Sequence, residues 1–198
     1  MIYHDSIIHG QTEESAYNLR IVLTRLQERG ITVNPAKCKL GVSEVEYVGH
    51  VISETGLTMS DSKKQKVLDF PLPETPKQLR GFLGLVNYFR DHIRGHAVIC
   101  HPLHQLVAIC SGKRLQWTPV SNCAFQEIKA AVAELQTLFF RVEEATVYLH
   151  TDACNYGVGA YVFKVIDGVD RPIGFYSKSL KGAELNWSTI EQECYAIM

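Results

Sequence analysis

No stretch of this sequence approaches the ~20 consecutive apolar residues that a membrane-spanning helix needs, and its first residues do not resemble a signal peptide. Paired C-x-x-C motifs are also missing, although the chain has six cysteines. These absences argue against membrane insertion, secretion and a disulfide framework. We therefore expect reduced thiols and an intracellular location, in the cytoplasm or the nucleus. The cysteines are Cys38, Cys100, Cys110, Cys123, Cys154 and Cys194.

Net charge is almost absent, because the formal value for the 198 residues is -1. Nucleic-acid binding would therefore have to rest on local patches rather than on a global basic field. Residues 63–94 form one such patch, with seven Lys/Arg against three Asp/Glu. Internal repeats and low-complexity tracts are missing too, so the chain is expected to be compact, as one large or two small domains.

Residues 1–58 predict part of an α/β layer. The segment MIYHDSII predicts a strand, a tight turn and a second strand. A helix is expected from Thr12 to Gly30, and its apolar spacing indicates that it lies on a sheet. Residues 31–34 predict a short strand before a proline turn. Residues 44–53 and 57–60 predict the two strands of a hairpin around the SETG turn.

From residue 61 the pattern becomes helical. Gly81 and Gly84 lie away from the apolar face of the central helix, and each interior glycine costs a helix ~1 kcal/mol relative to alanine. Something must therefore approach this backbone closely. Either another helix packs there, or a nucleic-acid backbone does, assisted by Arg80, Arg90 and Arg94. The apolar face comprises Leu79, Phe82, Leu83, Val86, Phe89 and Ile93.

The last third predicts a helix after Trp117, three strands joined by short turns, and a final helix from about Ser188. Asp152 stands at the exposed end of the first strand, before two glycines. It is either a turn residue or one acid of a metal site. The final helix carries Glu191 and Glu193, so a second carboxylate could face Asp152. Two such acids are half of a metal site.

The order of short motifs is distinctive: YHDS, NPAKC, VGHVIS, LRGFLGLVNYF, QWT and TDAC follow one another along the chain. In this order the sequence resembles the pol polyprotein of gypsy-type long-terminal-repeat retrotransposons and related retroviruses, over essentially its whole length. The resemblance implies an α+β fold. Its parts would be the end of a reverse transcriptase palm (1–58), a helical thumb (59–111), a connection (112–144) and the start of a mixed-sheet ribonuclease H-like domain (145–198).

The same resemblance implies roles for particular residues. Asp5 falls on the first catalytic aspartate of the palm, which binds magnesium in the family, and Tyr3 on the tyrosine beside it. Asp152 and Glu193 fall on the first two acids of the ribonuclease H site. The residues expected to contact a template-primer duplex or an RNA–DNA hybrid are Tyr47, Val48, Gly49 and His50 of the primer grip, and Arg80, Gly84, Asn87 and Tyr88 of the thumb helix.

The sequence also departs from the family pattern. Ser6 replaces the second palm aspartate, and the sequence looks cut at both ends, so that a third polymerase carboxylate and two of the four ribonuclease H acids are missing. Two-metal phosphoryl transfer needs several carboxylates around two Mg²⁺ ions. The family function is RNA-directed DNA synthesis with ribonuclease H hydrolysis, but we expect this chain alone to be inactive. The alternative is a non-catalytic nucleic-acid-binding or scaffold module.

A group of histidines and cysteines raises a separate zinc hypothesis, because residues four apart on a helix can share a metal ion. Pro102 is expected to interrupt that helix, and packing in the helical part is favoured over metal binding. Nothing in the sequence indicates the oligomeric state. The group comprises His92, His96, Cys100, His101, His104 and Cys110.

Overall fold

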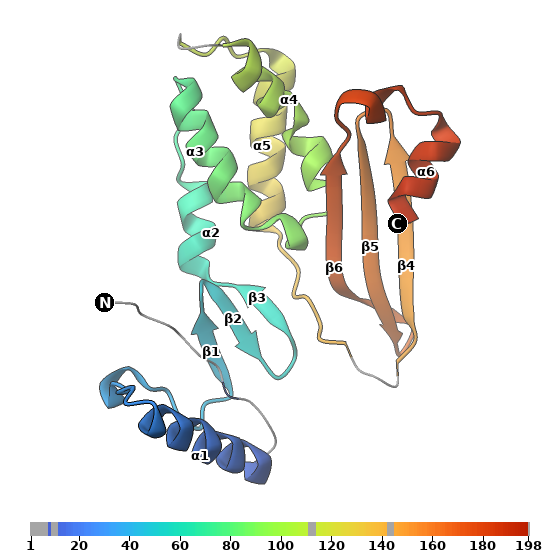
Figure 1. Cartoon of the computed structure of the whole chain (residues 1–198). Helices are drawn as coiled ribbons and strands as arrows, with labels where there is room; N and C mark the ends of the chain where they lie inside the picture. The colour runs from blue at the N-terminus through green and yellow to red at the C-terminus, as the bar shows by residue number, and fades with distance from the viewer. Residues whose placement is uncertain (1–7, 9–11, 111–113, 142–144, 198) are drawn as a thin grey trace.

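A computed structural model describes residues 8, 12–110, 114–141 and 145–197 (Figure 1). Residues 1–7 of the expected strand–turn–strand lie outside the described residues, and Tyr3, Asp5 and Ser6 with them. No helix in the described part of the chain is long and apolar enough to cross a membrane. The fold combines helices with two three-stranded sheets, so the α+β prediction is confirmed.

Helix α1 (Thr12–Glu28) forms where the sequence predicts it, and Gly30 follows it with a positive φ of 67°. The prediction that α1 packs on a sheet is wrong for the part of the chain that the structure describes. Leu19 and Val22 are only half-buried, and Leu23 is 45% exposed, so no apolar face of α1 is fully covered. Figure 1 shows α1 below the first sheet and away from the other helices.

The strand expected at residues 31–34 is absent from the structure, which has irregular chain there before the 3₁₀ turn η1 (Pro35–Lys37). The side chain of Asn34 caps η1 by accepting a hydrogen bond from the amide of Ala36 at 3.0 Å. This local bond favours a turn over an extended strand.

The first sheet has the order β1-β2-β3 and is antiparallel throughout. The continuous strand expected over residues 44–53 is wrong, because a two-residue turn at Val48 and Gly49 divides it. Their φ values of 49° and 79° give the doubly left-handed turn that suits the twist of a hairpin. The strands are β1 (Glu44–Tyr47), β2 (His50–Ser53) and β3 (Leu57–Met59).

Four helices and a 3₁₀ turn form the central part and share one apolar core. All six residues of the apolar face predicted for the central helix are buried, but the helix ends at Asn87, so Phe89 and Ile93 lie beyond it. Pro102 lies inside a continuous helix, so the predicted interruption is wrong. Cys100 and Leu103, on either side of Pro102, are both buried and pack both halves of this helix into the core. The elements are α2 (Asp61–Leu68), α3 (Pro76–Asn87), η2 (Arg90–His92), α4 (His96–Ile109) and α5 (Pro119–Ala133).

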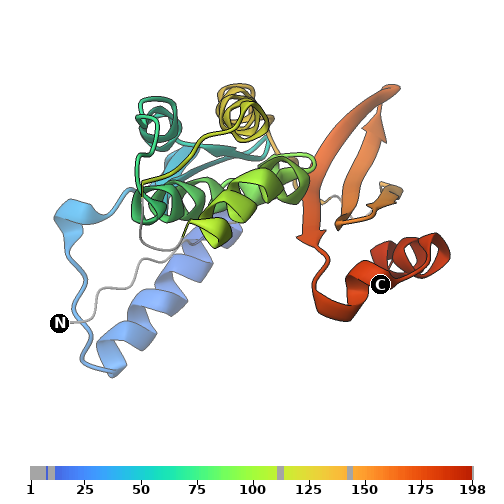
Figure 2. The same ribbon diagram turned by 90° about the horizontal axis from the view of Figure 1, so that it is seen from above.

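The second sheet is an antiparallel meander of order β4-β5-β6 beside the helical part (Figures 1 and 2). A register shift between Val162 and Phe163 sets Pro172 opposite Phe163, and such irregular positions tolerate proline. Helix α6 packs on β4 and β5. The elements are β4 (Val147–Cys154), β5 (Gly157–Ile166), β6 (Val169–Ser179), the 3₁₀ turn η3 (Gly182–Asn186) and α6 (Thr189–Ile197).

Candidate functional site

The turn between β1 and β2 is held against the start of α2. The amide of Ser60 donates a hydrogen bond to the Gly49 carbonyl at 3.1 Å. A β-carbon on Gly49 would lie 2.6 Å from Cε of Lys63, and the φ of 79° is unfavourable for other residues. The left-handed φ therefore favours glycine at this position, whereas the flexible Lys63 side chain could move aside. The neighbouring Val48 stays 58% exposed at the tip of the turn.

Three rings and one lysine join this turn to the end of α3. We call these residues, His50, Lys63, Tyr88 and His92, the Tyr88 cluster. The His50 ring lies 5.1 Å from Tyr88 and 5.8 Å from His92, and Lys63 Nζ lies 5.1 Å above the Tyr88 ring. The two segments expected to contact nucleic acid, residues 47–50 and 84–88, therefore contact each other through His50 and Tyr88. Among the described residues, His50 Nδ1, Tyr88 Oη and His92 Nε2 are buried without a hydrogen-bond partner.

Burial governs protonation in this cluster. It lowers the pKa of His50, an effect that Asp91 opposes and Lys63 reinforces. Burial also lowers the pKa of His92, against a hydrogen bond to the Gln136 carbonyl, and raises the pKa of Tyr88. Both histidines are therefore neutral at pH 7, and Lys63 supplies the positive charge beside Tyr88.

The outer face of α3 is open. An added β-carbon at Gly81 or Gly84 would meet no atom within 4 Å. Arg80 and Asn87 are exposed on the same helix. Close packing of another helix on these glycines, one of the two interpretations of the sequence, is therefore wrong for the part of the chain that the structure describes. The glycines leave bare backbone facing solvent, next to the Tyr88 cluster.

The two acids of the last third lie on neighbouring elements. Asp152 is exposed near the carboxyl end of β4, opposite Gly159. Glu193 is half-buried on α6, which lies across β4 in Figure 1. In the described part of the chain no three His, Cys, Asp or Glu side chains converge as a metal site would require. The structure therefore places the two carboxylates on contacting elements, β4 and α6, and brings no third ligand to them among the described residues.

Glu191 has a different role from Glu193. Its carboxylate accepts hydrogen bonds from the Ser188 amide at 2.7 Å and from the Ser188 hydroxyl at 2.8 Å. These bonds, the backbone one first, lower the pKa of Glu191. The Glu191 amide in turn donates to the Ser188 hydroxyl at 3.4 Å, which completes a capping box at the start of α6. The Glu191 carboxylate is therefore already hydrogen-bonded to Ser188. Glu193 is then the carboxylate on this helix that remains available to a metal ion.

Helix α6 is anchored to β6 through Lys178. Lys178 Nζ lies 3.4 Å from a Glu184 carboxylate oxygen and donates to the Tyr195 hydroxyl, with its ammonium 4.4 Å from the Tyr195 ring centre. Trp187 packs edge-on against Tyr195 with ring centres 5.0 Å apart. These contacts fix the orientation of the helix that carries Glu193.

Comparison with known proteins identifies the family of this chain. A family model described as "RNase H-like domain found in reverse transcriptase" matches residues 117–198. The Tf2-3 transposon polyprotein of Schizosaccharomyces pombe is 34% identical over 196 residues, which is 98% of this chain and 15% of that protein. The Tf2-7 polyprotein of the same yeast is 35% identical over 199 residues, 99% of this chain and 15% of that protein. The chain belongs to the retrotransposon pol polyprotein family.

Solved structures agree with this assignment. The pol segment superposes on the foamy viral protease-reverse transcriptase in complex with an RNA/DNA hybrid, with a TM-score of 0.79 and 25% identity. That match covers 96% of this chain and 26% of the viral chain. The same viral protein in complex with dsDNA gives a TM-score of 0.74 and 26% identity, covering 93% and 38% of the two chains. The pol segment spans about 15% of the length of the yeast relatives above.

The histidines and cysteines of the zinc hypothesis make separate contacts in the pol segment. Cys100 Sγ lies 3.7 Å from His96 Nε2, and both side chains are buried. The His101 ring stacks 5.0 Å from Tyr156, and His92 contacts Gln136. These residues pack the helical part, as the sequence favours, and the geometry gives the zinc hypothesis no support.

Sequence reasoning missed two residues of the Tyr88 cluster. Lys63 belongs to the basic patch of residues 63–94, but no sequence signal pairs it with Gly49 and Tyr88. His92 entered the zinc hypothesis instead, although its ring stacks on His50. Helical spacing suggested that His92 has a partner nearby in the sequence, whereas its ring partner, His50, lies on β2 about forty residues earlier.

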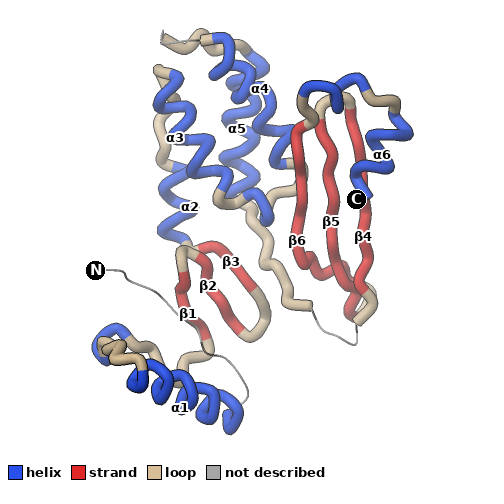
Figure 3. The backbone as a smooth tube through the Cα atoms, in the orientation of Figure 1, coloured by secondary structure: helices blue, strands red, loops and turns tan. Residues whose placement is uncertain are grey.

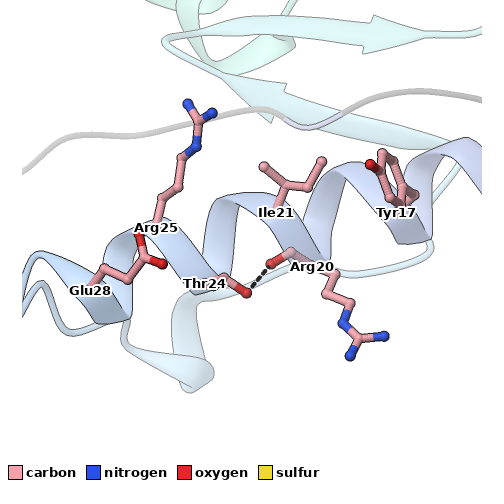
Figure 4. A pocket seen from close by; sticks show the side chains of 6 residues that line it. All are labelled: Tyr17, Arg20, Ile21, Thr24, Arg25 and Glu28. Atoms are coloured by element: carbon pink, nitrogen blue, oxygen red, sulfur yellow. Dashed lines mark hydrogen bonds between the residues drawn. The ribbon is translucent and has the colours of Figure 1, made fainter.

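A shallow hollow on α1 is not part of this surface. Figure 4 shows that the described residues lining it all come from α1, and that the Thr24 hydroxyl donates to the Arg20 carbonyl, at 2.8 Å. Side chains of a single exposed helix do not enclose a ligand. The lining residues are Tyr17, Arg20, Ile21, Thr24, Arg25 and Glu28.

Proposed function

We propose that this pol segment binds an RNA–DNA hybrid or template-primer duplex on the surface formed by the Val48–Gly49 turn, the Tyr88 cluster and the open face of α3. The observation that carries the proposal is the bare backbone at Gly81 and Gly84. Helical glycines that contact nothing lower helix stability by ~1 kcal/mol each relative to alanine, so their presence needs a partner that approaches the helix backbone.

The charges of this surface suit a polyanion. Lys63 lies beside Tyr88, and Arg80 is exposed on α3 next to Gly81. Lysine and arginine contacts to phosphate position a duplex without reading its sequence. Neutral His50 and His92 add aromatic packing without adding charge. Binding is therefore expected to be insensitive to sequence and sensitive to salt.

Asp152 and Glu193 are the carboxylates that this segment contributes to a ribonuclease H centre. Mg²⁺, when bound there, would activate a water molecule and neutralise the leaving oxygen. The fit of the described residues is partial, because Mg²⁺ keeps its waters unless several carboxylates converge. Asp152 would hold the ion from the strand and Glu193 from the helix. The segment alone is expected to hydrolyse no hybrid, and with Asp5 as its single palm acid it is expected to extend no primer.

The test is fluorescence anisotropy of a labelled RNA–DNA hybrid at increasing salt. The affinity should fall steeply, and Arg80→Gln should make the slope of log affinity against log salt shallower by about 1, since one phosphate contact is lost. Arg25→Gln on α1 is the matched control and should leave the slope unchanged. Absence of salt-dependent binding by the unmodified chain would contradict the proposal.

A non-catalytic binding or scaffold module is the second candidate. It is favoured by the lack of a third converging acid in the described part of the chain. Hybrid binding without cleavage, in Mg²⁺ or Mn²⁺, is expected of both candidates for this segment alone. Cleavage that disappears in Asp152→Asn supports a working ribonuclease H centre instead.

A further inference from the structure

The Val48–Gly49 turn is docked on the helical part through the start of α2 and through the Tyr88 cluster. The Ser60 amide donates to the Gly49 carbonyl at 3.1 Å, and the His50 ring beside the turn packs in the cluster. Figure 3 shows the first sheet meeting the helical part at this end of α2. Val48 has a φ of 49°, which a branched side chain disfavours, so the turn is a strained element that these contacts keep in place.

Three polar atoms of the cluster, His50 Nδ1, Tyr88 Oη and His92 Nε2, are shielded from solvent and have no hydrogen-bond partner in the part of the chain that the structure describes. His92 itself is only 4% exposed. Its Nδ1–H donates to the Gln136 carbonyl at 3.3 Å, so Nε2 of the neutral ring carries a lone pair and no proton. Protonation would turn this buried acceptor into a charged donor without an acceptor, which is costly.

The surroundings of the two histidines do not offset that cost. Burial has the largest effect and lowers the pKa of both rings. Asp91 raises both pKa values, but Arg90 Nε lies 3.2 Å from the same carboxylate and competes for it. The rings also disfavour a second proton, because the charge of His50 lowers the pKa of His92. The charged and titratable groups facing the rings are Lys63 and Lys64 of α2, Tyr88 at the end of α3 and Asp91 of η2.

We propose that the Tyr88 cluster is a proton-controlled latch: the Val48–Gly49 turn stays docked on α2 while His50 and His92 are neutral, and it detaches when they take up protons. Detachment lets water solvate the new charges and lets the two imidazoles separate. It also relieves the left-handed φ of Val48. The latch is a property of the protein alone and goes beyond the proposed function, since it operates without nucleic acid.

The docked form should weaken as the pH falls below the ordinary histidine pKa of 6.5. Histidines of the detached form take up protons there, whereas docked histidines resist, so the detached form binds more protons and gains population. The Ser60 amide reports docking, because its bond to the Gly49 carbonyl breaks when the turn detaches. Its hydrogen-exchange protection, corrected for the intrinsic rate at each pH, should fall about tenfold or more between pH 7 and pH 5.

Two variants and a matched control assign this loss to the cluster. His50→Phe keeps a ring against Tyr88 but cannot be protonated, and His92→Gln keeps a side-chain donor for the Gln136 carbonyl. Each should reduce the loss of Ser60 protection to about threefold or less. The control is His96→Gln, which removes a buried histidine of lowered pKa from α4, outside the cluster. It should show the full loss.

Amides of the helical core separate local opening from global unfolding. Phe82 and Leu103 are fully buried, and their amides should stay protected at pH 5 while Ser60 exchanges. Unchanged Ser60 protection between pH 7 and pH 5 in the unmodified chain would overturn the latch. Equal losses in His50→Phe, His92→Gln and His96→Gln, or a parallel loss at the core amides, would overturn it too. The proposed function is tested separately, by hybrid binding of the unmodified chain at pH 7.

Discussion

His96 and Cys100 lie one helical turn apart in α4, with His96 Nε2 3.7 Å from Cys100 Sγ inside the helical core. Burial lowers the pKa of His96 to about 4, and nearby His104 and Arg90 act in the same direction, whereas Asp91 opposes them. Burial raises the pKa of Cys100 to about 12. The pair is therefore a neutral imidazole beside a neutral thiol, which suits packing rather than metal binding.

The free energy of unfolding should fall as the pH drops from about 6.5 to 4. Unfolded His96 takes up a proton near its ordinary pKa of 6.5, whereas folded His96 resists until about 4. The unfolded state thus binds more protons in this window, and the loss from this group is roughly 3 kcal/mol at its lower end. Urea unfolding at pH 7.5, 5.5 and 4.5 measures this loss of unfolding free energy.

His96→Gln isolates this contribution, because His50, His92 and His104 have lowered pKa values too and act in the same direction. The variant should show a flatter dependence of stability on pH. The same slope in both proteins would contradict the assignment of the effect to His96.

Thiol reagents should separate the cysteines by exposure. All six are free, and all lie in the described part of the chain. Cys38, Cys123 and Cys194 are exposed and should react quickly at pH 8. Cys100 is fully buried with a raised pKa and should react only after unfolding in urea. Mass spectrometry of the labelled peptides measures this order, and early labelling of Cys100 would contradict the packing of α4.

Gly84→Ala should have opposite effects on stability and on binding. The added methyl group meets no atom, so the free energy of unfolding should rise by about 0.5–1 kcal/mol. If a duplex approaches this backbone, the same methyl group should weaken hybrid binding about tenfold, which is ~1.4 kcal/mol. Urea unfolding and anisotropy measure the two effects.

Asn122→Ala on the exposed side of α5 is the control for this variant. Alanine favours the helix over asparagine there as well, so a gain in stability is expected without loss of affinity. Gly84→Ala with unchanged affinity would show that the open face of α3 is not the contact surface.

The helical spacing of apolar residues alone predicted which side of α3 is buried in the core. Leu79, Phe82 and Val86 recur at helical spacing and are all fully buried on α3. The three strands of the second sheet and the short turns between them also followed from the sequence, but their antiparallel order did not. The sequence also placed His50 and Tyr88 in one nucleic-acid-binding set, through resemblance, without indicating that their rings pack together.

The unpredicted features depend on contacts between distant segments. Val48 at a positive φ is a poor turn residue, because its branched side chain disfavours that conformation. The bond of Ser60 to Gly49 and the packing of Lys63 hold the turn, and neither follows from local sequence. The Leu57–Leu138 pairing joins residues about eighty positions apart, which no periodic pattern reveals.

The two glutamates of α6 should differ in their effect on metal binding. Mn²⁺ is expected to bind the segment with a dissociation constant of about 1 mM or weaker, since no third ligand converges with Asp152 and Glu193 among the residues that the structure describes. Asp152→Asn and Glu193→Gln should each weaken this binding further, as measured by water-proton relaxation.

Glu191→Gln is the matched control on the same helix. Glutamine serves in a capping box as glutamate does, so α6 should still begin at its usual place. The variant removes one negative charge two residues from Glu193, and Mn²⁺ binding should change less than twofold because Glu191 is turned to the cap. Equal losses in Glu191→Gln and Glu193→Gln would mean that the ion responds to the general charge of α6. The assignment of Glu193 as the ligand would then be wrong.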